Sequence, residues 1–281
     1  MGPSKVTNLT EIAYAKINLA LHVRNRRADG YHALETLFAF AEDGDELTVS
    51  AADTLSLTIA GRFANGLTSG PDNLILRAAT AMQSSFGIKA GAALHLDKRL
   101  PIAAGIGGGS ADASAAIRLL ILHWGIEAEA DQLHAIAARL GADVPACLLS
   151  QTCFGSGIGD ELAVVVDAGL AGRPILMVNP LVPCPTGPVF SAWDGVDRGA
   201  LNARDWMAGR NDLQKPAVLL VPIIADVLTA LADTRAILTR MSGSGATCFA
   251  LFEDENSRDE AAISICGAHP DWWLSSTVLR D

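Results

Sequence analysis

The stretch Pro101-Ile-Ala-Ala-Gly105-Ile-Gly107-Gly108-Gly109-Ser110-Ala111-Asp112 decides how this sequence is interpreted, because it has four glycines within five residues before a predicted helix. Glycine allows positive φ and leaves the backbone N–H groups uncovered, so several of them can face one anion. The positive end of the following helix dipole adds to this attraction. The segment therefore predicts a polyphosphate-binding loop. A glycine-rich helix entry that serves only tight packing is the alternative.

Two well-known phosphate loops do not match this segment. A P-loop requires a Gly-Lys dipeptide, and the chain contains none. The dinucleotide fingerprint requires glycine at the position that Ser110 occupies. The segment is therefore neither a P-loop nor a dinucleotide fingerprint.

Working outward from the loop, hydrophobic periodicity predicts a mixed α+β region up to about residue 170. The expected strands are Glu11–Val23, Asp45–Ala52, Leu55–Gly61, Ala92–Leu96, Thr152–Gly155 and Leu162–Val166, the second and third forming a hairpin. The expected helices are Asn73–Phe86 with Asp72 as N-cap, Ser110–Trp124, and Asp131–Leu140 ended by Gly141.

A second α+β pattern follows a separate predicted loop at residues 169–172, which is bounded by two glycines. Its order is strand, helix, strand, strand, helix, strand: Pro174–Val178, Asn211–Leu231, Ala236–Met241, Thr247–Phe252, Ser257–Cys266 and Trp273–Leu279. This βαββαβ order is typical of the ferredoxin-like arrangement. The sequence therefore predicts two domains, residues 1–170 and 171–281.

Composition narrows the possible functions. The net charge is −10, which opposes nucleic acid as a partner because phosphate backbones require clustered basic residues. The five cysteines form no Cys-x-x-Cys pair, so a reducing cytoplasm is the expected compartment. No 18-residue apolar run is present, so we expect no membrane span.

The first predicted strand carries Lys16 and Asn18, which share one face because they are two residues apart. An inward-facing lysine would need a carboxylate or phosphate partner. The alternative is an ordinary exposed lysine on an edge strand.

The segment Gly141-Ala-Asp143-Val-Pro145 places an acid among apolar residues and before a proline. Asp143 is interpreted either as the cap of the next segment or as a base that accepts the proton of a substrate hydroxyl.

The segment Met241-Ser-Gly243-Ser-Gly245-Ala-Thr247 joins two strands of the second domain. It is either a flexible hairpin turn or a second backbone nest that closes on phosphate or substrate.

Together these segments resemble the GHMP family of small-molecule kinases over nearly the whole chain. The resemblance rests on the segments quoted above and on Asp29-Gly30-Tyr31-His32, Asp72-Asn73-Leu74, Asp97-Lys98-Arg99-Leu100-Pro101, Thr186, Phe190, Asn211-Asp212-Leu213 and Gly243-Ser244-Gly245. It implies an N-terminal ribosomal-S5-like α+β domain and a C-terminal ferredoxin-like domain.

The resemblance also implies roles for single residues. Asp143 would be the catalytic base and Lys16 its electrostatic partner. The ATP-binding residues would be Pro101, Ala104, Gly105, Ile106, Gly107, Gly108, Gly109, Ser110 and Ala111, with Asn73 and Lys98 near the adenosine. The substrate-binding residues would be Asn18, Tyr31, His32, Asp143, Thr186 and Phe190, with Tyr31, His32 and Phe190 around a cytosine ring.

The activity implied is ATP-dependent phosphorylation of the 2-hydroxyl of a cytidine diphosphate conjugate of methylerythritol, in the non-mevalonate isoprenoid pathway. Mg²⁺ would accompany ATP, with protein ligands that the sequence leaves unassigned. A GHMP kinase acting on homoserine, mevalonate or a sugar is the first alternative, and a ligand-binding module without activity is the second. We expect a monomer or a weak homodimer.

Overall fold

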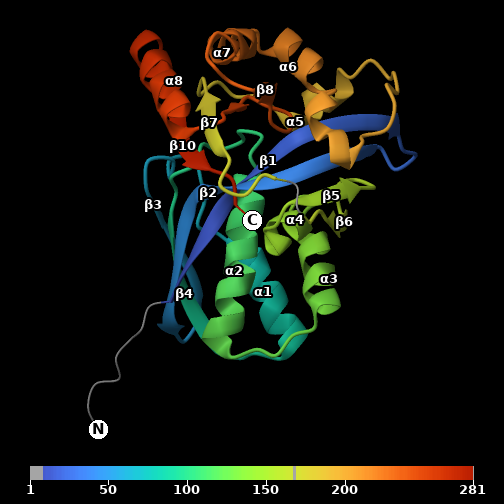
Figure 1. Ribbon diagram of the computed structural model, residues 1–281. Helices are drawn as coiled ribbons and strands as arrows, with labels where there is room; N and C mark the ends of the chain where they lie inside the picture. Colours follow the sequence, from blue (N-terminus) through green and yellow to red (C-terminus); the bar gives the residue numbers. More distant parts are fainter. Residues whose placement is uncertain (1–8, 167–168, 281) are drawn as a thin grey trace. The chain divides into compact units, whose positions relative to one another are not determined.

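The computed structural model describes residues 9–166 and 169–280 (Figure 1). These residues group into two compact units, each assembled from segments that are separate in the sequence. The first unit contains residues 9–14, 44–102 and 108–149, and the second contains residues 15–43, 103–107 and 150–280. The domain boundary expected at residue 170 stays a prediction.

Three strands form the sheet of the first unit. The second half of β2 (His32–Ala52) pairs antiparallel with β4 (Gly91–Asp97), and β4 pairs parallel with β3 (Leu55–Ala60). The predicted hairpin is therefore wrong, because β4 lies between its two strands. Gly91 makes this possible: a Cβ there would overlap the backbone of Thr54 in the turn between β2 and β3.

The helices of the first unit follow the predicted pattern, apart from one additional helix and small differences at their starts. They are α1 (Leu74–Phe86), α2 (Gly108–Trp124), α3 (Ala130–Leu140) and a short α4 (Val144–Leu149) that was not predicted. The N-cap of α1 is Asn73 and not Asp72. Asn73 has extended φ and ψ, and its side-chain oxygen accepts the N–H of Ile75 at 2.9 Å.

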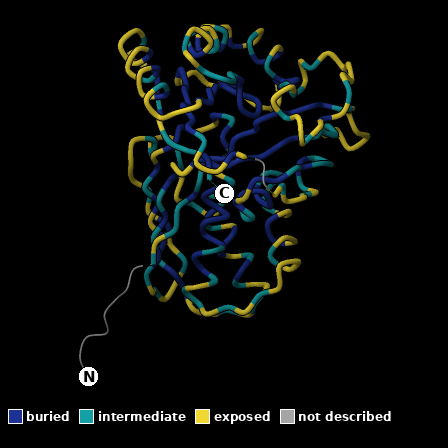
Figure 2. Tube along the Cα trace, viewed as in Figure 1, coloured by how far each residue is buried: buried dark blue, intermediate teal, exposed yellow. Residues whose placement is uncertain are grey.

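Helix α2 is buried on most of its surface, which explains why its sequence shows little amphipathic periodicity (Figure 2). Small residues allow close packing, since Ala111, Ala113, Ala115 and Ala116 are all buried. Ser114 is also buried, and its hydroxyl donates to the backbone oxygen of Ser110 at 2.8 Å. Helix α1 packs against α2.

The second unit contains a four-stranded antiparallel sheet with the order β10-β7-β9-β8. Its strands are β7 (Pro174–Asn179), β8 (Leu238–Met241), β9 (Cys248–Leu251) and β10 (Trp273–Val278). Helix α7 packs on β8 and β9, and α8 packs on β10 and β7. This order is that of a ferredoxin-like βαββαβ fold, so the prediction for this part of the chain is confirmed.

Further strands complete the second unit. The first half of β2 pairs antiparallel with β5 (Cys153–Ser156), which pairs with β6 (Glu161–Val164). Strand β1 (Leu9–Arg26) pairs with β2.

The long helix predicted for Asn211–Leu231 is broken in two. Helix α6 (Gln214–Leu220) ends at Val221, where φ is −133° and ψ is 80°, and α7 (Ile223–Ala232) begins after Pro222. Proline disfavours the helical conformation for the residue before it and lacks an N–H donor, so the helix stops there. The remaining helices are α5 (Thr186–Ser191), the 3₁₀ helix η1 (Ala203–Ala208) and α8 (Glu255–Ala268). Within residues 9–166 and 169–280, no helix combines the length and apolar character needed to cross a membrane.

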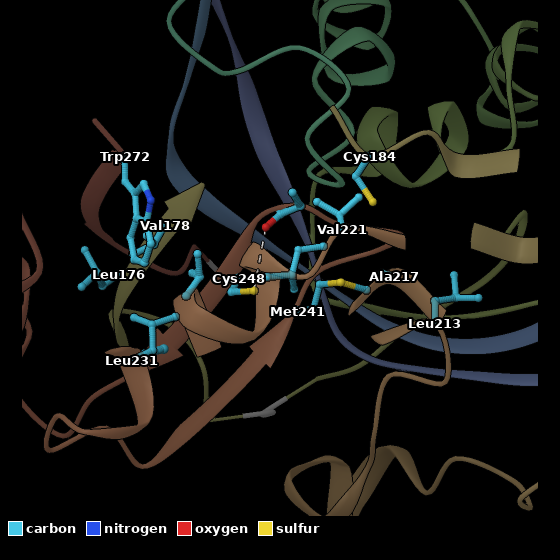
Figure 3. Packing of buried hydrophobic residues seen from close by; sticks show 14 of the residues in the cluster. Leu176, Val178, Cys184, Leu213, Ala217, Val221, Leu231, Met241, Cys248 and Trp272 are labelled. Atoms are coloured by element: carbon cyan, nitrogen blue, oxygen red, sulfur yellow. Dashed lines mark hydrogen bonds between the residues drawn. The ribbon is translucent and has the colours of Figure 1, made fainter. Parts of the chain in front are cut away.

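One hydrophobic core joins the sheet and helices of the second unit (Figure 3). The core includes Leu176 and Val178 of β7, Met241 of β8 and Leu231 of α7. Leu21 and Val23 of β1 belong to the same core, although they are far away in the sequence.

His22 links β1 to the loop before α6. The side chain is buried, its Nδ1 lies 3.0 Å from the oxygen of Gly199, and its Nε2 accepts the N–H of Arg210 at 3.2 Å. Both bonds form together only when Nδ1 carries the proton and the ring is neutral. Burial, followed by the charge of Arg210, lowers the pKa of His22.

We expect this lowered pKa to make stability depend on pH. The unfolded chain takes up a proton near pH 6.5 whereas the folded chain resists it, so the contribution of His22 is complete above that value and declines at lower pH. Urea unfolding of the wild type and His22→Gln at pH 7 and at about pH 5 measures it. The wild type should lose more unfolding free energy between the two pH values. An equal loss in both proteins would contradict the prediction.

Candidate active site

The glycine loop has the backbone that its sequence predicts. It leads from β4 to α2, and φ is positive at Ala103 (51°), Gly105 (75°) and Gly107 (64°). Helix α2 begins at Gly108, two residues before the predicted start, so Gly108 and Gly109 lie in its first turn. The first-turn N–H groups of a helix have no partners within the helix, which makes this end suited to an anion.

Several predicted ATP-binding residues could take part only through their backbones. Pro101, Ala104, Ile106 and Ala111 have buried side chains. The oxygen of Ala104 accepts the N–H of Thr247 at 3.1 Å.

The loop Ser242–Gly245 packs directly against Gly105. A Cβ on Gly105 would lie 2.5 Å from the oxygen of Ser242, and a Cβ on Gly243 would lie 2.7 Å from the oxygen of Gly105. The hydroxyl of Ser242 donates to the oxygen of Gly105 at 2.9 Å and accepts the N–H of Asn18 at 3.1 Å. The segment is therefore ordered by these contacts, which a flexible hairpin turn would lack.

Lys16 and Asn18 lie in the interior, so the alternative of an exposed lysine is wrong. Lys16 is 3% exposed, and its ammonium donates to Oδ1 of Asn18 at 2.9 Å. The amide of Asn18 donates to the hydroxyl of Thr36 at 2.8 Å, and the Lys16 ammonium lies 5.2 Å from the ring centre of Phe38. The network fixes the position of the ammonium, and the sequence did not indicate Thr36 as part of it.

Asp143 lies at the start of α4, between Gly141 and the helix. Its backbone oxygen accepts the N–H of Cys147 at 3.0 Å, which is the first bond of that helix. Pro145 fits the first turn, where its missing N–H costs nothing. The half-buried carboxyl group belongs to the first unit and Lys16 to the second, so their pairing stays a prediction.

The two residues expected near the adenosine are both engaged within the protein. Besides capping α1, Asn73 donates from its amide to the oxygen of Thr68 at 2.8 Å. Lys98 is 2% exposed, and its ammonium contacts Asp45 at 2.5 Å and Asp112 at 2.7 Å. Their contact with a nucleotide stays a prediction.

Burial and the two carboxylates act on Lys98 in opposite directions. Burial alone would lower the pKa of Lys98, but Asp112 and Asp45 outweigh it, so the pKa is raised and the ammonium stays charged. Burial raises the pKa of the Asp112 carboxyl to about 7, against the attraction of Lys98.

Aromatic residues gather around His32. The ring of Phe190 lies 5.1 Å from that of His32, and Trp193 meets His32 edge-on at 5.7 Å. Burial, followed by the charge of Arg26, lowers the pKa of His32, so the neutral ring prevails at neutral pH. Sequence reasoning missed Trp193, although its position three residues after Phe190 is a usable signal.

Two further predicted substrate residues, Tyr31 and Thr186, lie on the surface. Tyr31 is 59% exposed. Thr186 is exposed at the start of α5, with its hydroxyl 2.9 Å from that of Ser244.

Among the residues that the structure describes, no three His, Cys, Asp or Glu side chains come together in a way that could hold a metal ion.

The contact at Gly105 leads to a matched pair of variants. Gly105→Ala should distort the glycine loop, since its Cβ would meet backbone oxygens at a positive φ, and ATP affinity should fall by about tenfold or more. Gly267→Ala is the control, because a Cβ at this position in helix α8 would meet no atom within 4 Å and Gly267 is not among the predicted ATP-binding residues. Calorimetry with ATP compares the two, and equal affinities would refute the role of this contact.

Two family models match the chain. The model of the GHMP kinases N terminal domain matches residues 73–151, and that of the GHMP kinases C terminal matches residues 197–269. The first match contains the glycine loop, and the second contains the Ser242–Gly245 loop.

Similar proteins agree along nearly the whole chain. A 4-diphosphocytidyl-2-C-methyl-D-erythritol kinase of Rhizorhabdus wittichii is 54% identical and covers 99% of this chain and 97% of its own. A protein of the same name from Sphingopyxis alaskensis is 51% identical over 97% of this chain and 99% of its own. The chain therefore belongs to the GHMP kinases, and within that class to the family of 4-diphosphocytidyl-2-C-methyl-D-erythritol kinases.

Solved structures agree with this assignment. A 4-(cytidine 5'-diphospho)-2C-methyl-D-erythritol kinase has a TM-score of 0.82 at 30% identity and covers 97% of this chain and 100% of its own. A homoserine kinase of Cytophaga hutchinsonii has a TM-score of 0.73 at 17% identity and covers 100% of this chain and 98% of its own, which shows the shared fold alone.

Proposed function

We propose that this chain transfers the γ-phosphoryl group of ATP to the 2-hydroxyl of 4-diphosphocytidyl-2-C-methyl-D-erythritol. The observation that carries the proposal is the 54% identity to a relative of that name, over 99% of the chain. The ordered glycine loop, the buried Lys16 and the aromatic residues around His32 supply chemistry suited to this reaction.

In the proposed step, the substrate oxygen attacks the γ-phosphorus, the bond to the bridging oxygen breaks, and ADP leaves. Asp143 accepts the hydroxyl proton, and the ammonium of Lys16 stabilises the negative charge of the transferring group. Asn18 supports this role, because its hydrogen bond holds the buried ammonium in one position.

ATP would bind at the glycine loop, with phosphate oxygens facing the backbone N–H groups near Gly107 and Gly108. Mg²⁺ neutralises phosphate charge in such reactions and often binds mainly through phosphate oxygens and water. We assign it no protein ligand.

The cytosine ring of the substrate would stack beside His32 and Phe190, with Tyr31 and Thr186 at the exposed rim. A neutral His32 favours such stacking, since its ring needs no counter-ion when it is desolvated. Homoserine and mevalonate have no base to occupy this place. The alternative activities are tested by comparing ATP consumption with the cytidyl substrate, homoserine, mevalonate and galactose, and preference for any of the last three would overturn the proposal.

Asp143→Asn should lower kcat by about 10²–10⁴, the usual contribution of a positioned base, with little change in either KM. The amide keeps the size of the carboxylate but accepts no proton. Asp131→Asn is the control, because Asp131 is an exposed acid in the first turn of α3. A kcat for Asp143→Asn within about threefold of wild type would show that Asp143 is not the base.

Phe190→Ala should raise KM for the cytidyl substrate by about 5–150-fold, because stacking on a base is worth about 1–3 kcal/mol. KM for ATP should stay unchanged. The wild type should also prefer the cytidyl substrate to free methylerythritol phosphate, and Phe190→Ala should lose most of that preference. Steady-state kinetics with both acceptors measures this, and an undiminished preference would refute the stacking role.

A further inference from the structure

Three buried ionisable residues lie around the ends of the glycine loop. They are not among the residues proposed to act on the substrate. Lys98 follows the last residue of β4 on the way to the loop, Asp112 lies after the loop in α2, and Asp45 lies in β2. Their exposed fractions are 2%, 4% and 0%, and all three belong to the first unit.

The contacts of this cluster reach both ends of the glycine loop. Asp45 accepts the N–H groups of Arg99 at 2.6 Å and Leu100 at 2.8 Å, which fixes the chain where it enters the loop. The ammonium of Lys98 joins Asp45 to Asp112, which lies one helical turn after Gly108.

The ammonium of Lys98 also lies against the first turn of α2. It would be 3.1 Å from a Cβ placed on Gly108, so this glycine lets the ammonium approach the helix backbone. Two of its three donors are used by the carboxylates, which hold it in this place.

Such a cluster contributes little net stability to a fold for the burial that it requires. Buried ion pairs often contribute less than apolar residues of the same volume, because the charges lose their hydration. Oδ1 of Asp112 is buried and is among the described side-chain atoms without a hydrogen-bond partner, which adds to the cost. A need to fix the spacing of the two loop ends would explain why buried charged side chains occupy this place.

We propose that Lys98, Asp45 and Asp112 form a positioning cluster that holds the entry and exit of the glycine loop at a fixed spacing and thereby sets the affinity for ATP. This inference rests on the proposed binding of ATP at the loop. Lys98 then acts through Asp112 and Asp45, and contact with the adenosine is not required of it.

The test measures ATP binding by calorimetry in folded variants, with folding checked by circular dichroism. Asp112→Ala removes the acceptor and should weaken ATP binding by about tenfold or more, or about 1.4 kcal/mol. Asp112→Asn keeps an acceptor for Lys98 and should weaken it by less than about threefold. If Asp112→Ala does not fold, Asp112→Ser replaces it, because its hydroxyl is too short to reach the ammonium.

Arg99→Met is the matched control. Arg99 adjoins Lys98 and also pairs with two carboxylates, Asp97 at 2.7 Å and Glu46 at 2.8 Å, but its side chain is 49% exposed. Removing this surface network should leave ATP affinity unchanged.

Kinetics distinguish positioning from general stabilisation. In Asp112→Ala, KM for ATP should rise while KM for the acceptor stays constant, and Asp112→Asn should restore most of the loss. Normal ATP affinity in Asp112→Ala, or an equal loss in Asp112→Asn, would overturn the inference alone. A wild-type protein that does not bind ATP would overturn the proposed function and this inference with it.

Discussion

The backbone of the glycine loop lies against the Ser242–Gly245 loop, and the organisation of the second unit depends on this contact. It is possible only because Gly105 and Gly243 carry no Cβ on the facing sides. The hydroxyl of Ser242 then connects the contact to β1 through the N–H of Asn18. The amide of Asn211 donates to the oxygen of Gly243 at 2.8 Å, which extends the connection to the segment before α6. Four segments far apart in the sequence are thus connected through this backbone contact and the side chains of Ser242 and Asn211.

Most of the elements were predictable because they are encoded by local patterns. The helix from Leu74 to Phe86 has apolar residues at helical spacing, and the ferredoxin-like order follows from six separate periodic segments. Long-range choices were not predictable in this way. Only the tertiary structure shows that β4 separates β2 from β3, since this pairing brings Gly91 close to the backbone of Thr54, a fit that alternation within each strand does not encode.

The candidate site was predictable to the extent that glycine and short motifs encode it. The glycine loop and the shared face of Lys16 and Asn18 follow from residue type and spacing. Asp45 could not be identified from its local sequence, because an acid at the start of an alternating strand usually faces solvent. Its complete burial depends on Lys98, which is more than fifty residues away in the chain.

The core of the second unit has a consequence for the order in which the protein is made. Leu21 and Val23 emerge from the ribosome early, whereas the four strands of the sheet that shares their core begin only at Pro174, and the last of them, β10, is synthesised near the end of the chain. The apolar residues of β1 therefore lack part of their native partners through much of translation. Exposed strands of this kind are prone to wrong association, and nascent chains are commonly shielded by chaperones during such an interval. The late strands determine when that interval ends.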